Sequence, residues 1–150
     1  MLAFEANPRN FWYLQRHVEN NHLSGNVSAF HLGISDKQGE LYFQSGTGTG
    51  TGFLAESGEV RVPTKSVDQL VDEHNAVPTH MKIDVEGGEV AVLEGARKTL
   101  KEHHPLIFLS THGSEIKAQC MNYLAELGYT FESMDDRTVE QCADFVCRYK

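Results

Sequence analysis

The sequence HMKIDVEGGE, residues 80–89, decides the fold and the candidate site of this chain. Apolar residues alternate with polar ones through Met81–Val85, which predicts a short strand. Two glycines and a helical pattern follow, so we expect the strand to stop at Asp84 to Glu86 and to turn directly into a helix. In open α/β sheets, ligands bind at the carboxyl ends of strands. Asp84 and Glu86 therefore form a candidate ligand site, although either acid could instead cap the following helix.

The composition is typical of a globular domain with its own core. The chain has 150 residues, of which 40% are hydrophobic and 23% charged. Its net charge of -8 argues against nucleic acid or a membrane surface as a partner, because either would require a basic face. No apolar stretch approaches the roughly 18 residues of a membrane span, and no signal peptide is recognisable. Three cysteines without a CxxC pair indicate free thiols, so we expect a cytoplasmic protein.

Strand and helix patterns alternate along the chain. The predicted strands are Leu2–Glu5, Val27–Ile34, Glu40–Gln44, Glu59–Val62, Met81–Val85, Leu106–Leu109, Tyr129–Met134 and Phe145–Tyr149. The predicted helices are Pro8 to about His22, a short one after the capping box Ser66-x-x-Gln69, one that includes Val90 to Lys101, and one that Ser114 caps and Gly128 ends. We expect a hairpin between the second and third strands and antiparallel pairing of the last two. Right-handed crossovers then give an α/β fold whose mostly parallel sheet is covered on both faces.

Residues 45–58 include the low-complexity run SGTGTGTG. The run fits neither the G-x-G-x-x-G pattern nor the phosphate-binding loop, and no helical pattern follows it directly. We expect a flexible surface loop, with a mobile lid over a site as the alternative.

Three stretches carry a resemblance to a known family. AFEANP at residues 3–8 resembles the second-strand motif of S-adenosylmethionine-dependent methyltransferases. ISDKQGELYF at 34–43 resembles the following strand and hairpin of the FkbM-type members, and MKIDVEGGEVAVLEGA at 81–96 is similar to their signature KIDVEGxE. The resemblance runs from Leu2 to about Tyr149 and implies a Rossmann-like three-layer sandwich.

The resemblance also implies residues that bind S-adenosyl-L-methionine. Glu5 matches the acid that accepts hydrogen bonds from the ribose hydroxyls, since a carboxylate offers two acceptors to a diol. Its alternative role is that of an acid at a helix start. Asp36 lies where such enzymes contact the adenine, or it is a turn residue before Gly39. Asp84 should face the methylsulfonium end of the cofactor.

The implied reaction is methyl transfer to a hydroxyl group of a small molecule or glycan. A general base would help to remove the hydroxyl proton, and the candidates are Glu86 and His112, which follow neighbouring predicted strands. Asp84 is then expected to orient the cofactor or the base. The same three side chains could hold a divalent ion, but a lone histidine at a strand end is more often structural than a ligand, so we predict no metal site.

The chain departs from the family in one respect. Methyltransferases of this class begin with an earlier strand and a glycine-rich cofactor loop, which should precede AFEANP and which this sequence does not show. That strand would lie between Leu2–Glu5 and Met81–Val85, so two half-sheets with exposed edges are expected. We therefore predict one incomplete domain, truncated at its N-terminus and lacking the usual first strand, over residues 1–150. The alternative function is a non-catalytic module that needs a partner segment, such as a second copy in a homodimer, to complete its sheet and cofactor site.

Overall fold

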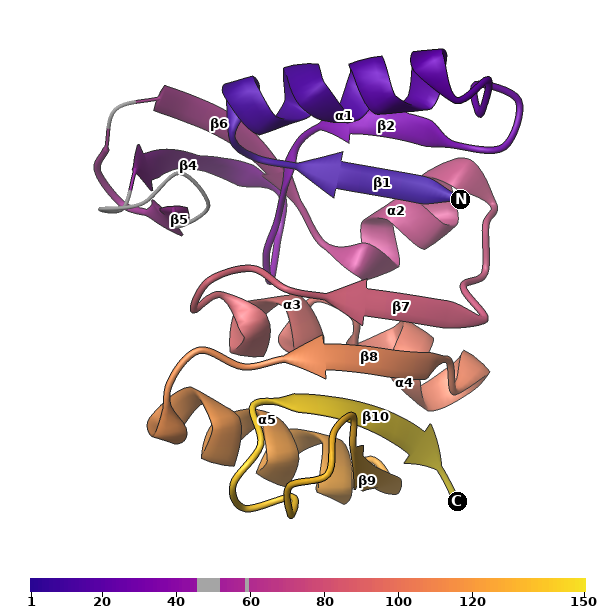
Figure 1. The fold of residues 1–150 in the computed structure, drawn as a ribbon, viewed down its shortest axis with the longest axis vertical. Helices are drawn as coiled ribbons and strands as arrows, with labels where there is room; N and C mark the ends of the chain where they lie inside the picture. Colours follow the sequence, from indigo (N-terminus) through magenta and orange to yellow (C-terminus); the bar gives the residue numbers. More distant parts are fainter. Residues whose placement is uncertain (46–51, 59) are drawn as a thin grey trace.

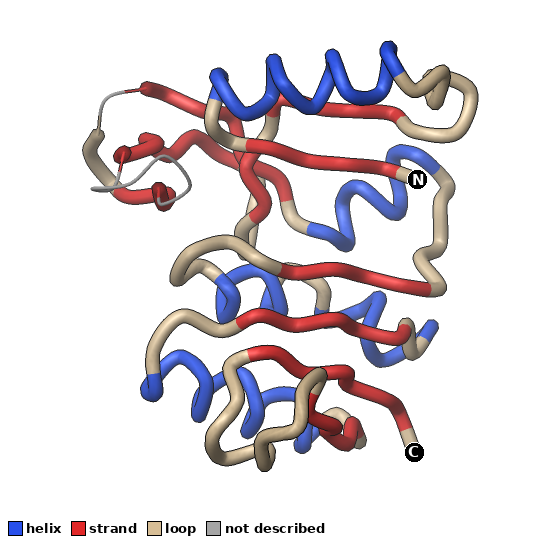
Figure 2. The backbone as a smooth tube through the Cα atoms, in the orientation of Figure 1, coloured by secondary structure: helices blue, strands red, loops and turns tan. Residues whose placement is uncertain are grey.

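The computed structural model describes residues 1–45, 52–58 and 60–150 (Figure 1 and Figure 2). The strands are β1 (Leu2–Glu5), β2 (Ser28–His31), β3 (Gly33–Ile34), β4 (Gly39–Ser45), β5 (Gly52–Ala55), β6 (Val60–Lys65), β7 (His80–Ile83), β8 (Leu106–Ser110), β9 (Tyr129–Ser133) and β10 (Asp144–Tyr149). The helices are α1 (Pro8–Asn20), α2 (Val67–His74), α3 (Glu89–Glu94), α4 (Arg97–His103) and α5 (Ser114–Glu126). The strand, turn and helix predicted from HMKIDVEGGE are β7, the turn after it, and α3.

Three separate sheets take the place of the mostly parallel sheet that we predicted. β1 and β2 pair in parallel, and a second sheet has the order β7-β8-β10-β9. In that sheet β7 and β8 are parallel, whereas β10 runs antiparallel to β8 and to β9. The third sheet, β3-β6-β4-β5, is mainly antiparallel. The α/β class and the antiparallel last strand are confirmed, but the mostly parallel layout is not seen, because the described strands form parallel pairs (β1-β2, β3-β6, β7-β8) and antiparallel pairs (β4-β5, β4-β6, β8-β10, β9-β10).

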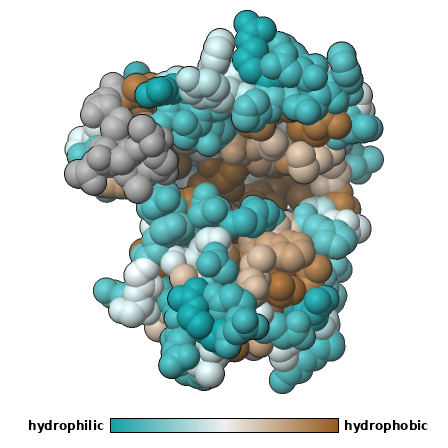
Figure 3. Space-filling view, viewed as in Figure 1, coloured by the Kyte–Doolittle hydropathy of each residue, from teal (hydrophilic) through white to brown (hydrophobic). Residues whose placement is uncertain are grey.

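The free edges of β1 and β7 belong to different sheets. Both strands point in the same direction in Figure 1, and no hydrogen-bonded ladder joins them in the part of the chain that the structure describes. The space-filling view shows an apolar hollow between these two strands (Figure 3). Among the described residues, β1 and β7 therefore each have an edge without a hydrogen-bonded neighbour strand, and the truncation that predicted such edges stays a prediction.

The predicted hairpin between Val27–Ile34 and Glu40–Gln44 is wrong. The first segment divides into β2 and β3, and β6 lies between β3 and β4. Thr64 of β6 pairs with Gly33 on one side and with Gly39 on the other, so β6 uses the edges that the hairpin would have joined. Part of the predicted 45–58 loop is the strand β5, which pairs with β4, and residues 46–51 of that prediction lie outside the described residues.

The helix predicted after the Gly-Gly pair is divided into α3 and α4 at Gly95. A Cβ atom at Gly95 would lie 2.2 Å from the carbonyl oxygen of Ser35, so the turn after β3 packs directly on the backbone there. The predicted cap at Ser114 is also wrong, because Gly113 is the N-cap residue and Ser114 begins α5. The capping box of α2 is confirmed: Ser66 and Gln69 exchange hydrogen bonds between side chain and backbone.

The buried core lies in the second half of the chain. Its fully buried apolar side chains come from α3, α4, β8, α5 and β10, and they include Leu93, Leu100, Ile107, Leu109, Leu124 and Phe145. Figure 1 shows α3, α4 and α5 on one face of the β7-β8-β10-β9 sheet, and on β8 the other two apolar residues, Leu106 and Phe108, are only half-buried. The expected cover on both faces is therefore not seen for this sheet among the described residues. All residues of β1 are half-buried, and α1 contains no buried residue.

The cysteines and the helices bear on two expectations from the sequence, namely free thiols and no membrane-spanning segment. All three cysteines carry free thiols, as the sequence indicated, and all three are buried. Within the described ranges, no helix has the length and apolar character needed to cross a lipid bilayer.

Candidate active site

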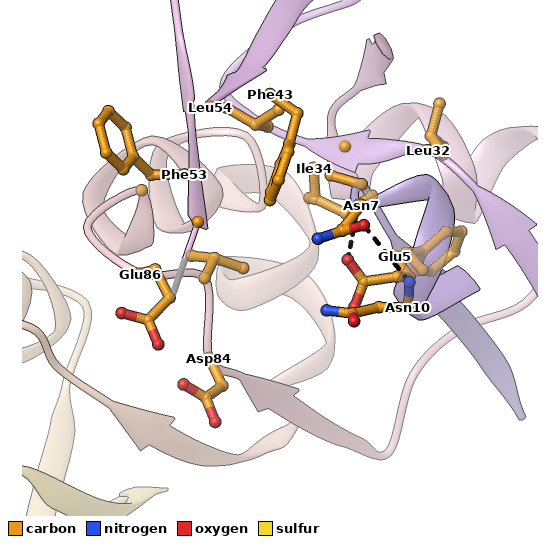
Figure 4. A pocket seen from close by; sticks show the side chains of 16 residues that line it. Glu5, Asn7, Asn10, Leu32, Ile34, Phe43, Phe53, Leu54, Asp84 and Glu86 are labelled. Atoms are coloured by element: carbon orange, nitrogen blue, oxygen red, sulfur yellow. Dashed lines mark hydrogen bonds between the residues drawn. The ribbon is translucent and has the colours of Figure 1, made fainter. Parts of the chain in front are cut away.

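A cavity of about 230 Å³ lies where β1, β7 and the β3-β6-β4-β5 sheet come together (Figure 4). The residues at the end of β1 and the start of α1 contribute polar groups, namely Glu5, Asn7 and Asn10. The strands β3, β4 and β5 contribute apolar side chains, namely Ile34, Phe43, Phe53 and Leu54. Asp84 and Glu86 complete the lining from the end of β7. The cavity thus has carboxylates from two strand ends and an apolar wall.

Glu5 occupies the carboxyl end of β1 and lines the cavity. One of its carboxylate oxygens accepts a hydrogen bond from the backbone N–H of Asn7, at 2.7 Å. Asn7 is the N-cap residue of α1, because its side-chain oxygen accepts from the N–H groups of Arg9 and Asn10. The capping role that was the alternative for Glu5 is therefore filled by Asn7, and Glu5 remains at the cavity wall.

Asp84 and Glu86 follow β7 in a turn that needs unusual backbone angles. Glu86 has φ +50° and Gly87 has φ +104°, which explains why a glycine follows Glu86. A non-glycine residue with positive φ is uncommon, and such strain concentrates at functional sites. Neither acid caps α3, since Gly88 is its N-cap residue and no side chain caps it. Asp84 instead forms an ion pair with Lys82, with 3.1 Å between Oδ2 and Nζ.

His112 follows β8 and lies at the same rim as the two acids. Its Nε2 atom is 3.7 Å from Oδ1 of Asp84 and 3.6 Å from Oε2 of Glu86. Its Nδ1 atom is 2.6 Å from Oε1 of Glu89. Burial lowers the pKa of His112, but the hydrogen bond with Glu89 and the charges of Glu86, Glu89 and Asp84 outweigh burial and raise the pKa above its ordinary value. The structure thus brings together Asp84, Glu86 and His112, as the sequence predicted.

Glu89 is the site residue that sequence reasoning missed. It is the last acid of the KIDVEGGE stretch, it lies in the first turn of α3, and its side chain is 0% exposed. A signal was available, because Glu89 lies four residues before Leu93 on the helical face that also carries Ala96 and Leu100. An acid on the apolar face of a helix is expected to have a buried partner.

Asp36 is not among the residues that line the cavity. Its carboxylate accepts a hydrogen bond from the Ser35 hydroxyl at 3.1 Å and pairs with Lys37 at 3.5 Å, in the turn between β3 and β4. This placement favours the turn role over an adenine contact. No three His, Cys, Asp or Glu side chains of the described chain are arranged to hold a metal ion.

Comparisons with known proteins agree on one family. Residues 1–136 match the family model described as the methyltransferase FkbM domain. The chain is 32% identical over 105 residues to the hexuronic acid methyltransferase AglP of Haloferax volcanii, a match that covers 67% of this chain and 43% of that protein. Its fold matches the crystal structure of methyltransferase FkbM from Methylobacillus flagellatus KT, with a TM-score of 0.68 and 19% identity, over 99% of this chain and 36% of that chain. The chain therefore spans less than half the length of each of these two proteins.

Proposed function

Because this chain belongs to the FkbM methyltransferase family, we propose that it transfers a methyl group from S-adenosyl-L-methionine to a hydroxyl group of a sugar or another small molecule. The observation that carries the proposal is the cavity at which carboxylates from the ends of β1 and β7 meet. In α/β folds, ligands bind outside the carboxyl ends of strands, where those strands diverge.

The lining of the cavity suits a nucleoside cofactor. Glu5 offers carboxylate acceptors for a ribose diol, and Ile34, Phe43 and Leu54 offer an apolar surface for a base. Asp84 supplies negative charge at the opposite wall, which favours a cationic sulfonium group. The volume is below the roughly 300–1,000 Å³ of pockets that enclose a drug-sized ligand, so the described residues enclose only part of such a ligand.

When bound, the cofactor would supply an activated methyl group, and the residues of this chain would supply position and proton transfer. Placing the acceptor oxygen in line with the methyl carbon is worth about 7–11 kcal/mol in well-oriented reactions. Glu86 lines the cavity and Nε2 of His112 lies 3.6 Å from its carboxylate, so either side chain could accept the hydroxyl proton. Such a base contributes typically about 10²–10⁴-fold to the rate.

A sugar acceptor is supported by the relative whose name describes a hexuronic acid methyltransferase. We propose that the acceptor is a hydroxyl group of a glycan that contains a hexuronic acid. The carboxylate group of that hexuronic acid then determines how tightly the acceptor binds.

Isothermal titration with S-adenosyl-L-methionine tests the proposal most directly. We expect saturable binding by this chain, and methyl transfer to a hexuronic acid glycoside at a higher kcat/KM than to the matching neutral hexoside. Equal kcat/KM values for the two glycosides would contradict the preference for a hexuronic acid but would still agree with the methyltransferase function. A complete lack of cofactor binding would contradict the proposal itself.

The open edges of β1 and β7 favour a second candidate function. A module whose sheet is completed by another chain would present these edges to a strand of that chain, which would satisfy their backbone groups. The simplest form is a homodimer. Sedimentation equilibrium combined with hydrogen exchange tests it, because dimerisation should protect the amides of β1 and β7. A chain that stays monomeric at high concentration rules out the homodimer.

A further inference from the structure

Glu89 is a buried acid whose position is unfavourable for stability. Its side chain is 0% exposed, and its Oε2 atom has no hydrogen-bond partner among the described residues. Burying a carboxyl group with an unpaired oxygen costs free energy, so an acid at this position calls for an explanation. An apolar residue would fit better among the neighbouring core side chains of α3, Val92 and Leu93. The second carboxylate oxygen of Glu89, Oε1, does have partners.

The Oε1 atom of Glu89 faces two nitrogen atoms. The backbone N–H of Gly87 donates to it at 3.2 Å, and Nδ1 of His112 lies 2.6 Å away. A backbone N–H can only donate, so Oε1 acts as an acceptor. An ionised carboxylate can only accept, so with Glu89 ionised the Nδ1 atom of His112 carries the hydrogen and donates it to Glu89. The contact thereby defines which nitrogen of the ring holds the proton.

This assignment leaves the Nε2 atom of neutral His112 with a free lone pair. Nε2 faces Asp84 and Glu86 at 3.7 Å and 3.6 Å, distances too long for direct hydrogen bonds. A neutral imidazole in this tautomer has its basic nitrogen beside Asp84 and Glu86, two residues that line the cavity, and its N–H directed toward the buried Glu89. His112 can therefore accept a proton at Nε2, on the side that faces Asp84 and Glu86.

We propose that Glu89 is a positioning residue that holds His112 in the Nδ1–H tautomer, so that Nε2 accepts the proton of the acceptor hydroxyl. The acceptor oxygen keeps the electron pair of its O–H bond, and the imidazolium that forms keeps its Nδ1–H bond to Glu89. The role of Nε2 as a base rests on the proposed methyltransferase function. The tautomer and its dependence on Glu89 do not.

The charged groups around His112 come from β7, from the turn after β7, and from α3. Asp84 and Glu86 face the ring from the turn after β7, and Glu89 faces it from α3. Lys82 lies beyond Asp84 and is paired with it. Of these acids, only Glu89 forms a hydrogen bond with the ring. Removing its charge should therefore lower the pKa of His112 while Asp84 and Glu86 remain in place.

Nitrogen-15 NMR of the histidine rings in the intact chain tests the inference without any activity measurement. Comparison with His112→Asn identifies the His112 signals among those of the eight histidines. We expect the neutral wild-type ring to carry its hydrogen on Nδ1. Glu89→Gln should keep this tautomer, because the amide oxygen still accepts, but should lower the pKa. Glu89→Leu should lose the preference for Nδ1–H.

Glu94→Gln is the matched control, because Glu94 lies on the same helix and is exposed. It should leave both the tautomer and the pKa of His112 unchanged. An Nε2–H tautomer in the wild-type protein would overturn the inference, as would equal pKa changes in Glu89→Gln and Glu94→Gln. If the Glu89 variants do not fold, the wild-type tautomer alone decides the question.

The proposed role of Nε2 of His112 as a base needs a separate measurement. In an active preparation, Glu89→Gln should shift the rising limb of the kcat–pH profile to lower pH and leave the KM for the cofactor unchanged. His112→Asn should lower kcat by about 10²–10⁴-fold. A kcat of His112→Asn equal to the wild-type value would overturn the role of Nε2 as a base. Loss of cofactor binding in the wild-type chain would instead contradict the proposed function.

Discussion

At the scale of single residues, the candidate site consists of three acids that line the cavity and of the His112–Glu89 pair beside them. Glu5 comes from β1, Asp84 and Glu86 from the turn after β7, and Glu89 and His112 from the start of α3 and the end of β8. The sequence alone identified all of them except Glu89. Asp84, Glu86 and Glu5 were recognisable because they end strands, whereas the role of Glu89 depends on a contact with a residue 23 positions away.

Glu5→Gln tests the proposed ribose contact. The amide keeps one acceptor but loses the charge, and a hydrogen bond to a charged group is worth roughly 1.5–3 kcal/mol. We therefore expect the affinity for S-adenosyl-L-methionine to fall about 10- to 100-fold in isothermal titration. Glu19→Gln on α1 is the control, because Glu19 is exposed and pairs only with Arg16 in the described structure. Equal losses in both variants would contradict a contact at Glu5.

The raised pKa of His112 makes the stability of the chain depend on pH. A histidine whose folded pKa lies above its unfolded value of about 6.5 contributes stability that is complete below that value. This contribution is lost as the pH rises through the folded pKa. We expect the difference in free energy of unfolding between wild type and His112→Asn to decrease as the pH rises above about 6.5. Urea unfolding from about pH 5 to about pH 8 measures it, and a constant difference would contradict the prediction.

At the scale of elements, local signals predicted the starts of α1 and α2 correctly but missed the cap of α5 and the break between α3 and α4. The capping box at Ser66 and the proline start of α1 were correct because both depend on neighbouring residues in the sequence. The break between α3 and α4 was not foreseen. Gly95 lies at this break in close contact with Ser35, a residue far away in the sequence.

Gly95→Ala tests how tight this contact is. A Cβ atom would lie 2.2 Å from the carbonyl oxygen of Ser35 and 3.0 Å from Cβ of Ser66, so the backbone must move. We expect a loss of about 1–3 kcal/mol in the free energy of unfolding, measured with urea. Gly25→Ala is the control, because no atom lies within 4 Å of the added Cβ and its φ is not in the left-handed region. Unchanged stability of Gly95→Ala would mean that the contact is not tight.

At the scale of the whole molecule, the buried core is unevenly distributed. The β7-β8-β10-β9 sheet and its helices contain the continuous buried cluster, whereas β1 is half-buried and has one hydrogen-bonded neighbour among the described strands. Stability should therefore differ between the two halves.

Hydrogen exchange tests this difference. We expect the amides of β8 and β10 to exchange only on global unfolding, and those of β1 to exchange at least about tenfold faster through local opening. Addition of S-adenosyl-L-methionine should slow exchange at β1, because Glu5 at its end lines the cavity. Equal protection of β1 and β8 in the free chain would contradict the uneven core.

The sequence by itself determined most of the strands and helices and the acids that end β1 and β7. Periodicity and turn residues act over a few neighbouring positions, so a linear sequence shows them directly. Only the tertiary structure decided that β6 lies between β3 and β4, that Gly95 divides a helix, and that Glu89 meets His112. These features depend on contacts between distant segments, where packing and buried polar pairing outweigh local preference.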